Sequence, residues 1–447
     1  MSEGSKGFTK TLANFIADTD ASKIPVTDYE HAKAAFLDWL AVTIGGKDDP
    51  LVLKLIKYSD MMGGDRQATI IGHKTKKSPS HAALINGASS HALDYDDTLV
   101  SFFGHPSVTL FPALLALAEW KEKSGRDFIA AYLIGLQVGS TVGASAGMEH
   151  YMAGWHATST LGHIASAAGC ARLLGLDAEK AGYALGIGAT QSSGLKRVFG
   201  TMCKPFHAGR ASESGLMAAL LAEQGFTSAE DILEGPLGFF HVFKGKPNKE
   251  KIALLGTDWD VRNLAQKYHA SCHATHSPLE AVLAVVKNEN IPVNEIKSIR
   301  VYSSKLAMDA AGKMTPSTGL EGKFSISYCV ANALLRGVTG NRAFTDTKVN
   351  DPIIKEFMKK IAVSLDPEIK ALESRVEVET NSGKNYNGFS DVLQQIPPLE
   401  MKKERIRDKF LDMSEPVMGK ERSKKVVEDV NVLEKIRNMK PFAEMLG

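Results

Sequence analysis

The spacing of apolar residues divides the chain into regions of two kinds. From Phe8 to about Lys267, apolar residues recur every three or four positions, which is typical of helices. Alanine and glycine fill many of the helix faces, so we expect a tightly packed and mostly buried bundle. Its helices are predicted at 29–44, 79–93, 110–123, 128–147, 158–174, 178–191 and 208–224.

The pattern changes after Lys267. Residues 295–302 and 374–380 alternate apolar and polar side chains, as half-buried strands do. Helical patterns flank them at 277–287 and 324–336, and highly charged helical patterns return at 402–410 and 424–438. The sequence therefore predicts a mainly α fold with a helical domain at 1–266, a smaller α/β domain at 267–397 and C-terminal helices at 398–447.

Composition limits the class of protein. The 447 residues are too many for one core, so two domains are expected. Lys and Arg (53) nearly balance Asp and Glu (51), which argues against a one-signed surface for nucleic acid or a membrane. The four cysteines form no CxxC pair, and residues 1–25 lack an apolar signal core. We therefore expect a cytoplasmic protein without a disulfide framework.

One uncharged stretch is long enough to span a bilayer. Residues 128–148 carry no charge, and Gly135, Gly139, Gly143 and Gly147 repeat at four-residue spacing. Gln, Ser and Thr side chains dilute its apolar character, and nothing else in the chain resembles a membrane segment. We interpret it as a buried helix whose glycine face allows close packing.

Residues 86–106 carry the densest candidate chemistry. Within 15 residues the chain places three carboxylates, two imidazoles and a hydroxyl: Asp94, Asp96, Asp97, His91, His105 and Thr98. Buried ionisable groups are costly unless they are paired, so such a cluster indicates an acid–base site. A solvated loop and a Mg²⁺-binding carboxylate cluster are the alternatives.

Three further segments could contribute to a site. His269, Cys272, His273 and His276 have a spacing that imitates zinc ligands, although we favour a segment that lines a cleft between the two regions. Lys204 is expected in a loop before a helix, where backbone N–H groups could bind an anion, with an ordinary surface lysine as the alternative. His156 lies at a helix start, where Thr158 or Ser159 could form the cap.

Together these segments resemble the MmgE/PrpD family, which includes 2-methylcitrate dehydratases, cis-aconitate decarboxylases and iminodisuccinate epimerases. The resemblance covers most of the chain and rests on motifs in a fixed order. They are Asn86-Gly, His91-Ala-Leu-Asp-Tyr-Asp-Asp-Thr98, His105-Pro, Gly154-Trp-His156, Gly200-Thr-Met-Cys-Lys204-Pro-Phe-His-Ala-Gly209, residues 232–239, Lys267, Cys272, Thr275-His276 and Phe324-Ser-Ile-Ser-Tyr328.

The resemblance implies a large all-helical domain, completed by the C-terminal helices, with an inserted α/β lid and an active site between them. It also implies a homodimer that uses neither a metal nor an organic cofactor. By motif position, Asp94, His105 and His156 are the expected catalytic residues. The expected substrate ligands are Thr98, Lys204, Lys267 and Tyr328.

These expectations indicate a lyase that acts on a small di- or tricarboxylate and removes a proton next to a carboxylate. A 2-methylcitrate dehydratase-like hydro-lyase is the first choice. A cis-aconitate decarboxylase-like enzyme, an iminodisuccinate epimerase-like enzyme and a non-catalytic polycarboxylate-binding protein are the alternatives. Two departures from the family, His269-Ala270 and the bulky Ser101-Phe-Phe-Gly104, are expected to reshape the pocket. Asp94 is expected to orient a neighbouring histidine or lysine.

Overall fold

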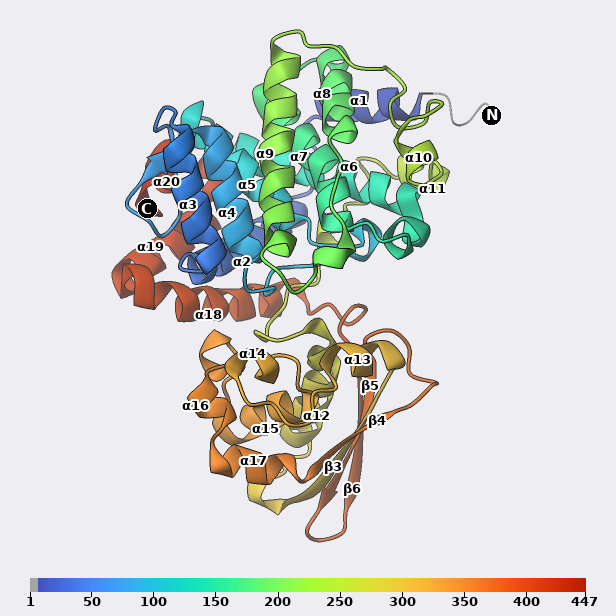
Figure 1. The fold of residues 1–447 in the computed structure, drawn as a ribbon, viewed down its shortest axis with the longest axis vertical. Helices are drawn as coiled ribbons and strands as arrows, with labels where there is room; N and C mark the ends of the chain where they lie inside the picture. Colours follow the sequence, from blue (N-terminus) through green and yellow to red (C-terminus); the bar gives the residue numbers. More distant parts are fainter. Residues whose placement is uncertain (1–6) are drawn as a thin grey trace. The chain divides into compact units, whose positions relative to one another are not determined.

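The computed structural model describes residues 7–447. The N-terminal segment 1–25, expected to lack a signal core, therefore lies partly outside the described residues. The described chain forms two compact units (Figure 1). The first unit contains the chain up to Gln266 together with Leu399–Gly447, and the second contains Lys267–Pro398. Helices dominate the secondary structure, which agrees with the predicted mainly α class.

The first unit is almost entirely helical, apart from a two-residue strand pair, β1 and β2. Its first half contains α1 (Phe8–Asp18), α2 (Val26–Gly46), α3 (Pro50–Met62), β1 (Ala68–Thr69), β2 (Lys76–Lys77), α4 (Pro79–His91), α5 (Ser107–Trp120) and α6 (Gly125–Met152). Its second half contains α7 (Ala157–Leu174), α8 (Ala178–Thr190), α9 (Cys203–Glu223), α10 (Phe239–Val242), α11 (Lys249–Ala253), α18 (Leu399–Met418), α19 (Lys420–Asn431) and α20 (Met439–Met445).

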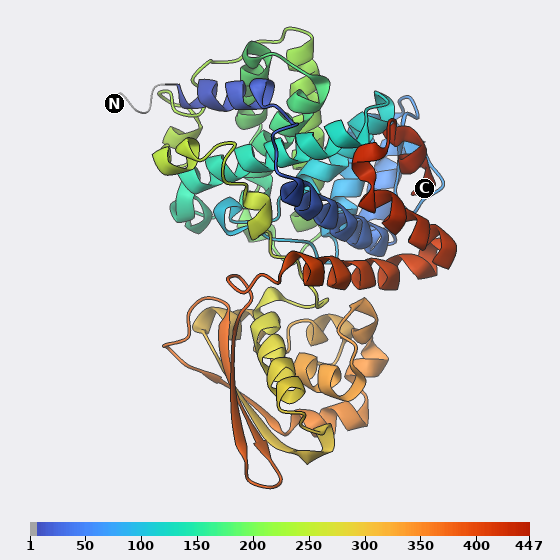
Figure 2. The same cartoon turned by 180° about the vertical axis from the view of Figure 1, so that it is seen from behind.

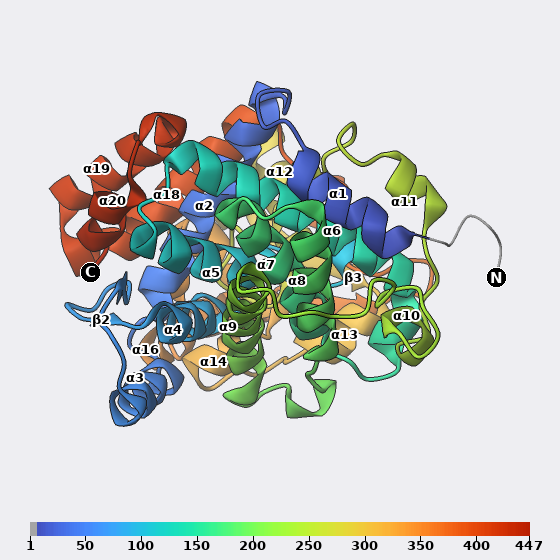
Figure 3. The same ribbon diagram turned by 90° about the horizontal axis from the view of Figure 1, so that it is seen from above.

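Helix α7 lies at the centre of the first unit, with α5, α6, α8 and α9 packed around it (Figure 3). Nearly every residue of α7 is buried, and many are small. Gly162 shows why: a Cβ added there would lie 2.6 Å from Thr109 Cγ2, so only glycine allows this approach of α5. The helix ends at Gly175, whose φ of 77° is the left-handed conformation common at helix ends. Small residues thus let the central helix accept neighbours on all sides.

Helix α6 contains the uncharged stretch. It is long and apolar enough to cross a membrane by length and composition, and 94% of its most apolar window is buried within the structure. Added Cβ atoms at Gly135 and Gly139 would lie 2.7 Å from Leu110 and 2.6 Å from Phe102. The packing at these two glycines agrees with the predicted close-packed face.

The predicted glycine face was wrong at its last position. Gly147 has φ 73° and ψ −179°, so the helical path breaks there instead of continuing. An added Cβ at Gly147 would have no atom within 4 Å. Gly147 lies where the backbone changes direction, and glycine suits this position because it adopts a positive φ without steric cost.

The second unit combines one four-stranded sheet with short helices. Its elements are α12 (His276–Asn288), β3 (Ile296–Ser303), α13 (Lys305–Ala311), α14 (Gly319–Gly322), α15 (Ile326–Arg336), α16 (Asp346–Val349), α17 (Pro352–Met358), β4 (Ile361–Leu365), β5 (Glu373–Thr380) and β6 (Asn385–Asp391). The strand order is β4-β3-β5-β6. Strands β3 and β4 are parallel, and the other neighbours are antiparallel.

The sheet of the second unit has one covered face. Along β5, buried residues alternate with half-buried ones, which is the period of a strand with one face in a core. The helix α12 packs against β5 and β6 on that face, and α15 packs beside it (Figure 2, where α12 is yellow). The alternation that identified residues 374–380 as a strand therefore reflects this two-layer packing.

Candidate active site

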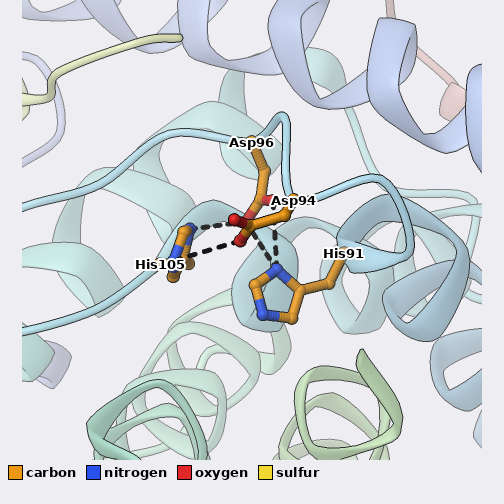
Figure 4. A group of neighbouring side chains, drawn as sticks. All are labelled: His91, Asp94, Asp96 and His105. Atoms are coloured by element: carbon orange, nitrogen blue, oxygen red, sulfur yellow. Dashed lines mark hydrogen bonds and ion pairs between the residues drawn. The ribbon is translucent and has the colours of Figure 1, made fainter. Parts of the chain in front are cut away.

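The acidic loop after α4 lies in the first unit and begins with an unusual backbone conformation. Helix α4 ends at His91, and Asp94 then takes a φ of 51°, in the left-handed region that few residues other than glycine adopt. Such strained residues often occur at functional sites. The turn places the side chains of Asp94 and Asp96 beside His91 and His105 (Figure 4).

Asp96 lies between two imidazoles. Its carboxylate oxygens are 2.9 and 3.0 Å from Nδ1 of His91, and its Oδ2 is 2.8 Å from Nδ1 of His105 (Figure 4). Burial alone would raise the pKa of the Asp96 carboxyl, but the two imidazoles outweigh burial and hold the pKa well below its usual range. Asp96 is therefore a buried carboxylate anion that accepts a hydrogen bond from the His91 ring and lies at ion-pair distance from the His105 ring.

His91 is the neutral member of this group. Burial lowers the pKa of His91 to about 4, against the opposing effect of Asp96. A neutral ring bound to Asp96 through Nδ1 carries its proton there and leaves a lone pair on Nε2. That buried Nε2 has no hydrogen-bond partner among the residues that the structure describes.

His105 is held from three sides. Its backbone N–H donates to Oγ1 of Thr158 at 3.2 Å, its ring meets Asp96, and Pro106 follows it at the start of α5. Thr158 was predicted as a possible cap of α7. The N-cap is instead His156, without a side-chain cap bond, and the Thr158 hydroxyl binds His105. The loop and the central helix together fix the imidazole of His105.

Asp94 pairs with Lys204. Oδ1 of Asp94 accepts from Nζ of Lys204 at 2.7 Å and lies 3.9 Å from Nε2 of His105. Burial would lower the pKa of Lys204, but Asp94 outweighs burial and raises it, so the side chain is an ammonium. Of the two carboxylates beside His105, Asp96 lies nearer, on the Nδ1 side, and Asp94 lies on the Nε2 side. The expectation that Asp94 orients a lysine agrees with this pairing.

The sequence predicted Lys204 in a loop before a helix, but the structure places it inside a helix. It is the second residue of α9, so it belongs to the first helical turn. One turn further, His207 lies on the same helix face, since residues three apart are neighbours on a helix. Nδ1 of His207 is 3.0 Å from Nδ1 of His156. Helix α9 therefore supplies both a cation and an imidazole to this group.

His156 is buried among cationic and aromatic neighbours. Its ring stacks 6.1 Å from the ring of His91 and meets Phe199 edge-on at 4.9 Å. Burial, followed by the neighbouring His91 imidazole and the Lys204 ammonium, holds the pKa of His156 well below its usual range. The imidazole of His156 is therefore neutral in the resting protein.

The acidic loop is supported from behind by the C-terminal helices. Nζ of Lys409, on α18, donates to the backbone oxygen of Tyr95 at 2.7 Å and lies 2.6 Å from Oδ1 of Asp38. All three residues are buried. Asp97 points into the same interior, where its carboxylate accepts from the hydroxyl of Ser107 at 2.5 Å. The charged C-terminal helix thus contributes a buried cation that holds the loop.

The remaining predicted residues of the first unit are less directly involved. Backbone hydrogen bonds pair Thr98 with Ala265, and the Thr98 hydroxyl lies 3.5 Å from the Ala265 oxygen. Phe102, expected to reshape the pocket, is instead buried against α6 at Gly139. The Phe102 ring therefore packs against the glycine face of α6. This packing accounts for the bulky residue at position 102.

The second unit contains Lys267 and Tyr328. Within this unit, the Tyr328 ring packs in the hydrophobic core and its hydroxyl donates to the Ala343 oxygen at 2.5 Å. Lys267 is the first residue of the unit. The expected ligand roles of Lys267 and Tyr328 stay predictions.

In the second unit, two of the histidines with zinc-like spacing, His269 and His276, bind different partners. His269 bonds Oγ1 of Thr339 through Nδ1 at 2.8 Å and pairs with Glu280 through Nε2 at 3.0 Å. His276 bonds the backbone oxygen of Ser271 at 3.2 Å through Nε2. The rings of His269 and His276 are 5.0 Å apart, yet each ring is held by a different group.

A cation would find ligand atoms in the first unit. His91, Asp94, Asp96 and His105 each offer one such atom, and these atoms lie within 4.8 Å of one another. Nitrogen and carboxylate donors of this kind suit zinc and related metals. The same four residues form the group of proton donors and acceptors described above. Measuring the metal content of the purified protein therefore distinguishes metal binding from proton transfer.

Comparison with known proteins identifies the family. The model of the MmgE/PrpD N-terminal domain matches residues 10–251, and that of the C-terminal domain matches residues 269–434. Curated relatives align over nearly their whole length. Cis-aconitate decarboxylase of Aspergillus terreus is 27% identical, over 100% of this chain and 97% of the relative.

Two further relatives have the same character. The cis-aconitate decarboxylase-like protein oryM of Aspergillus oryzae is 26% identical, over 95% of this chain and 94% of its own. Cis-aconitate decarboxylase of Mus musculus is 24% identical, over 99% of this chain and 93% of its own. The chain therefore belongs to the MmgE/PrpD family and is a lyase.

Proposed function

We propose that this lyase decarboxylates a small unsaturated polycarboxylate of the cis-aconitate type. One observation carries the proposal: Nε2 of His105 and Nζ of Lys204 approach the same oxygen of Asp94, at 3.9 and 2.7 Å. A proton donor and a fixed cation therefore lie within reach of one small substrate. The names of the similar curated proteins, which are cis-aconitate decarboxylases or resemble them, support this choice of substrate.

Substrate binding would use the cations and imidazoles of the first unit. A substrate carboxylate would replace Asp94 as partner of the Lys204 ammonium, in a partly buried place where such charge pairs are strengthened. His156 would contact a second carboxylate as a neutral hydrogen-bond donor. Lys267, Thr98 and Tyr328 remain proposed ligands by motif position, and the lid role of the second unit remains a proposal of the same kind.

The chemistry needs one proton at a defined place. When cis-aconitate loses CO₂ from its methylene arm, the C–C electron pair forms a new double bond. The original double bond shifts its electrons to the far alkene carbon, which then accepts one proton. His105 in its imidazolium form would deliver this proton from Nε2. Asp96, as a buried anion at Nδ1, would stabilise the imidazolium and fix the ring orientation.

The first choice from sequence was a hydro-lyase of the 2-methylcitrate dehydratase type. We replace it by decarboxylation because the similar curated proteins bear decarboxylase names over nearly the whole chain. Dehydration and epimerisation need the same positioned base, so the residues of the cluster do not separate them. These two reactions become outcomes of the test.

The test is a substrate panel in deuterated buffer. Cis-aconitate, 2-methylcitrate and an iminodisuccinate would each be incubated with the protein, with trapped CO₂ and product NMR as readouts. We expect one CO₂ released per cis-aconitate consumed and one carbon-bound deuterium in the product. Water loss from 2-methylcitrate without CO₂, or deuterium exchange without a new product, would replace decarboxylation by dehydration or epimerisation. Binding without any exchange would support the binding-protein alternative.

The homodimer and the cytoplasmic location predicted from the sequence stay proposals. Light scattering behind size-exclusion chromatography measures the first directly. A mass of twice the chain's 48.3 kDa is expected, and a mass of one chain would contradict it.

A further inference from the structure

The contact between His156 and His207 points to a second level of control in the candidate site. The two rings meet through Nδ1 of each, 3.0 Å apart, with centroids 5.3 Å apart. A hydrogen bond between two such nitrogens needs one proton, carried by one ring and accepted by the other. The pair therefore links the tautomer of His156 to that of His207.

Both imidazoles are neutral in the resting protein. Burial lowers the pKa of His207, and burial together with neighbouring imidazoles and the Lys204 ammonium holds that of His156 well below its usual range. A neutral imidazole has one N–H and one lone pair. Whichever atom donates across the contact, the opposite nitrogen of His156 is then fixed as either donor or acceptor.

The surroundings hold the pair in place. The backbone N–H of His156 donates to the oxygen of Gly194 at 3.0 Å. A Cβ added at Gly194 would lie 3.3 Å from Nδ1 of His207 and 2.7 Å from Cβ of Ser159, so the loop passes close to the His207 ring. Helix α9 fixes the other side, because His207 follows Lys204 by one turn. The contact is thus built from three segments of the first unit.

We infer that His207 is a positioning residue that donates its Nδ1–H to Nδ1 of His156 and so keeps the proton of His156 on Nε2. In this tautomer, His156 offers Nε2–H as a hydrogen-bond donor to a substrate carboxylate without carrying a charge. The inference rests on the proposed function for its anionic substrate. The other tautomer would present a lone pair to that anion, which is repulsive.

His207 acts through His156 and does not need to touch the substrate. Its Nδ1 is engaged with His156, and its side chain is only half-buried. A residue of this kind affects substrate affinity through the fraction of His156 in the competent tautomer. If removal of His207 left the two tautomers equally populated, KM would rise about twofold, with kcat changed less.

The direct test is ¹⁵N NMR of histidine-labelled protein without substrate. His156→Gln identifies the signals of His156 by their loss. In the wild type we expect Nε2 of His156 to be protonated and Nδ1 to be unprotonated. His207→Leu removes the donor, and we expect a mixture of both tautomers at His156. His207→Asn keeps an N–H donor near the same place and should restore the wild-type spectrum.

A matched control is His81→Leu, which removes another half-buried imidazole of the first unit, 6.0 Å from the ring of Tyr58. It should leave the His156 signals unchanged. A protonated Nδ1 of His156 in the wild type, or an unchanged His156 spectrum in His207→Leu, would overturn the inference. The wild-type spectrum alone shows which of the two rings donates the hydrogen bond, even if His207→Leu fails to fold.

This readout is separate from the proposed reaction. If no carboxylic acid in the panel is turned over but the His156 tautomer depends on His207, the proposed function fails while the positioning contact stands. If cis-aconitate is decarboxylated and His207→Leu leaves tautomer and KM unchanged, the proposed function stands and this inference fails.

Discussion

The two units each contain a group of histidines, and the groups differ in how they are assembled. In the first unit, His91 and His105 come from either end of a strained loop and meet at the buried carboxylate of Asp96. In the second unit, His269 and His276 come from one short segment and bond different partners. The histidines of the second unit have the sequence spacing of zinc ligands but bind separate partners. The histidines of the first unit lack that spacing, yet both contact the carboxylate of Asp96.

The difference shows what makes an imidazole useful. In the first unit, Asp96 holds Nδ1 of His105, and Nε2 faces the oxygen that Lys204 also binds. In the second unit, both ring nitrogens of His269 are engaged with Thr339 and Glu280. We therefore expect substitutions in the first group to affect turnover and those in the second to affect stability.

The largest expected effect is that of His105→Ala. A positioned general acid or base typically contributes about 10²–10⁴-fold to the rate. We expect kcat with cis-aconitate to fall by about that factor, with thermal unfolding close to that of the wild type. His81→Ala, outside the group, serves as control and should keep its turnover. Full turnover by His105→Ala would remove this histidine from the mechanism.

His269→Ala should show the opposite profile. The change removes two hydrogen bonds from a buried ring, and unpaired buried groups each cost about 1–3 kcal/mol. We expect a lower free energy of unfolding in urea and a smaller loss of kcat than in His105→Ala. Unchanged stability combined with abolished turnover would mean that the second group also takes part in the chemistry.

Asp97 gives the first unit a pH dependence of its own. Burial, and then the charge of Asp38, raises the pKa of Asp97 to about 8 from an ordinary 3.8. As pH rises, Asp97 loses its proton in the unfolded chain before it does so in the folded protein. The contribution of Asp97 to the free energy of unfolding is therefore fully present below about pH 4 and is lost as pH approaches about 8. Asp97→Asn removes this dependence.

We therefore expect the melting temperature of Asp97→Asn, relative to the wild type, to increase from about pH 5 to about pH 8. Asp65→Asn changes an exposed carboxylate and should show no such trend. A constant difference between Asp97→Asn and the wild type across this range would show that Asp97 ionises normally in the folded protein.

The smallest expected effect is that of a chelator. Each unit has a spacing or geometry that imitates a metal site, and the sequence predicts that neither holds a metal. Elemental analysis of protein purified without added metal should show no stoichiometric zinc or iron. EDTA should leave kcat unchanged. A stoichiometric metal would move His91, Asp94, Asp96 and His105 from proton transfer to metal binding.

Much of the fold was accessible from hydrophobic periodicity. The predicted helix at 178–191 matches α8, and the predicted strand at 374–380 matches β5 to within one residue. The strand β6 (Asn385–Asp391) was missed, because its polar sequence Asn-Tyr-Asn-Gly-Phe-Ser-Asp lacks the expected alternation and its pairing with β5 decides its structure. Tertiary contacts therefore override a weak local preference there.

The candidate site was only partly predictable. The motif order identified Asp94, His105 and Lys204 as a group, and the structure brings them together. The motif order did not single out Asp96 as a partner of His105, because spacing alone does not reveal that the left-handed turn at Asp94 places Asp96 beside His105. His207 also escaped notice, although its place one turn after Lys204 could have suggested it.

The proposed mechanism depends most on Asp96 as the group that orients His105. The deciding measurement is the kcat and KM of Asp96→Asn beside those of Asp94→Asn, with cis-aconitate and with unfolding curves for both. We expect Asp96→Asn to lose about 10²-fold or more in kcat with little change in KM, since the imidazolium loses its buried counter-charge. Asp94→Asn should lose less kcat. Wild-type kcat in Asp96→Asn, with turnover abolished in Asp94→Asn, would contradict the account.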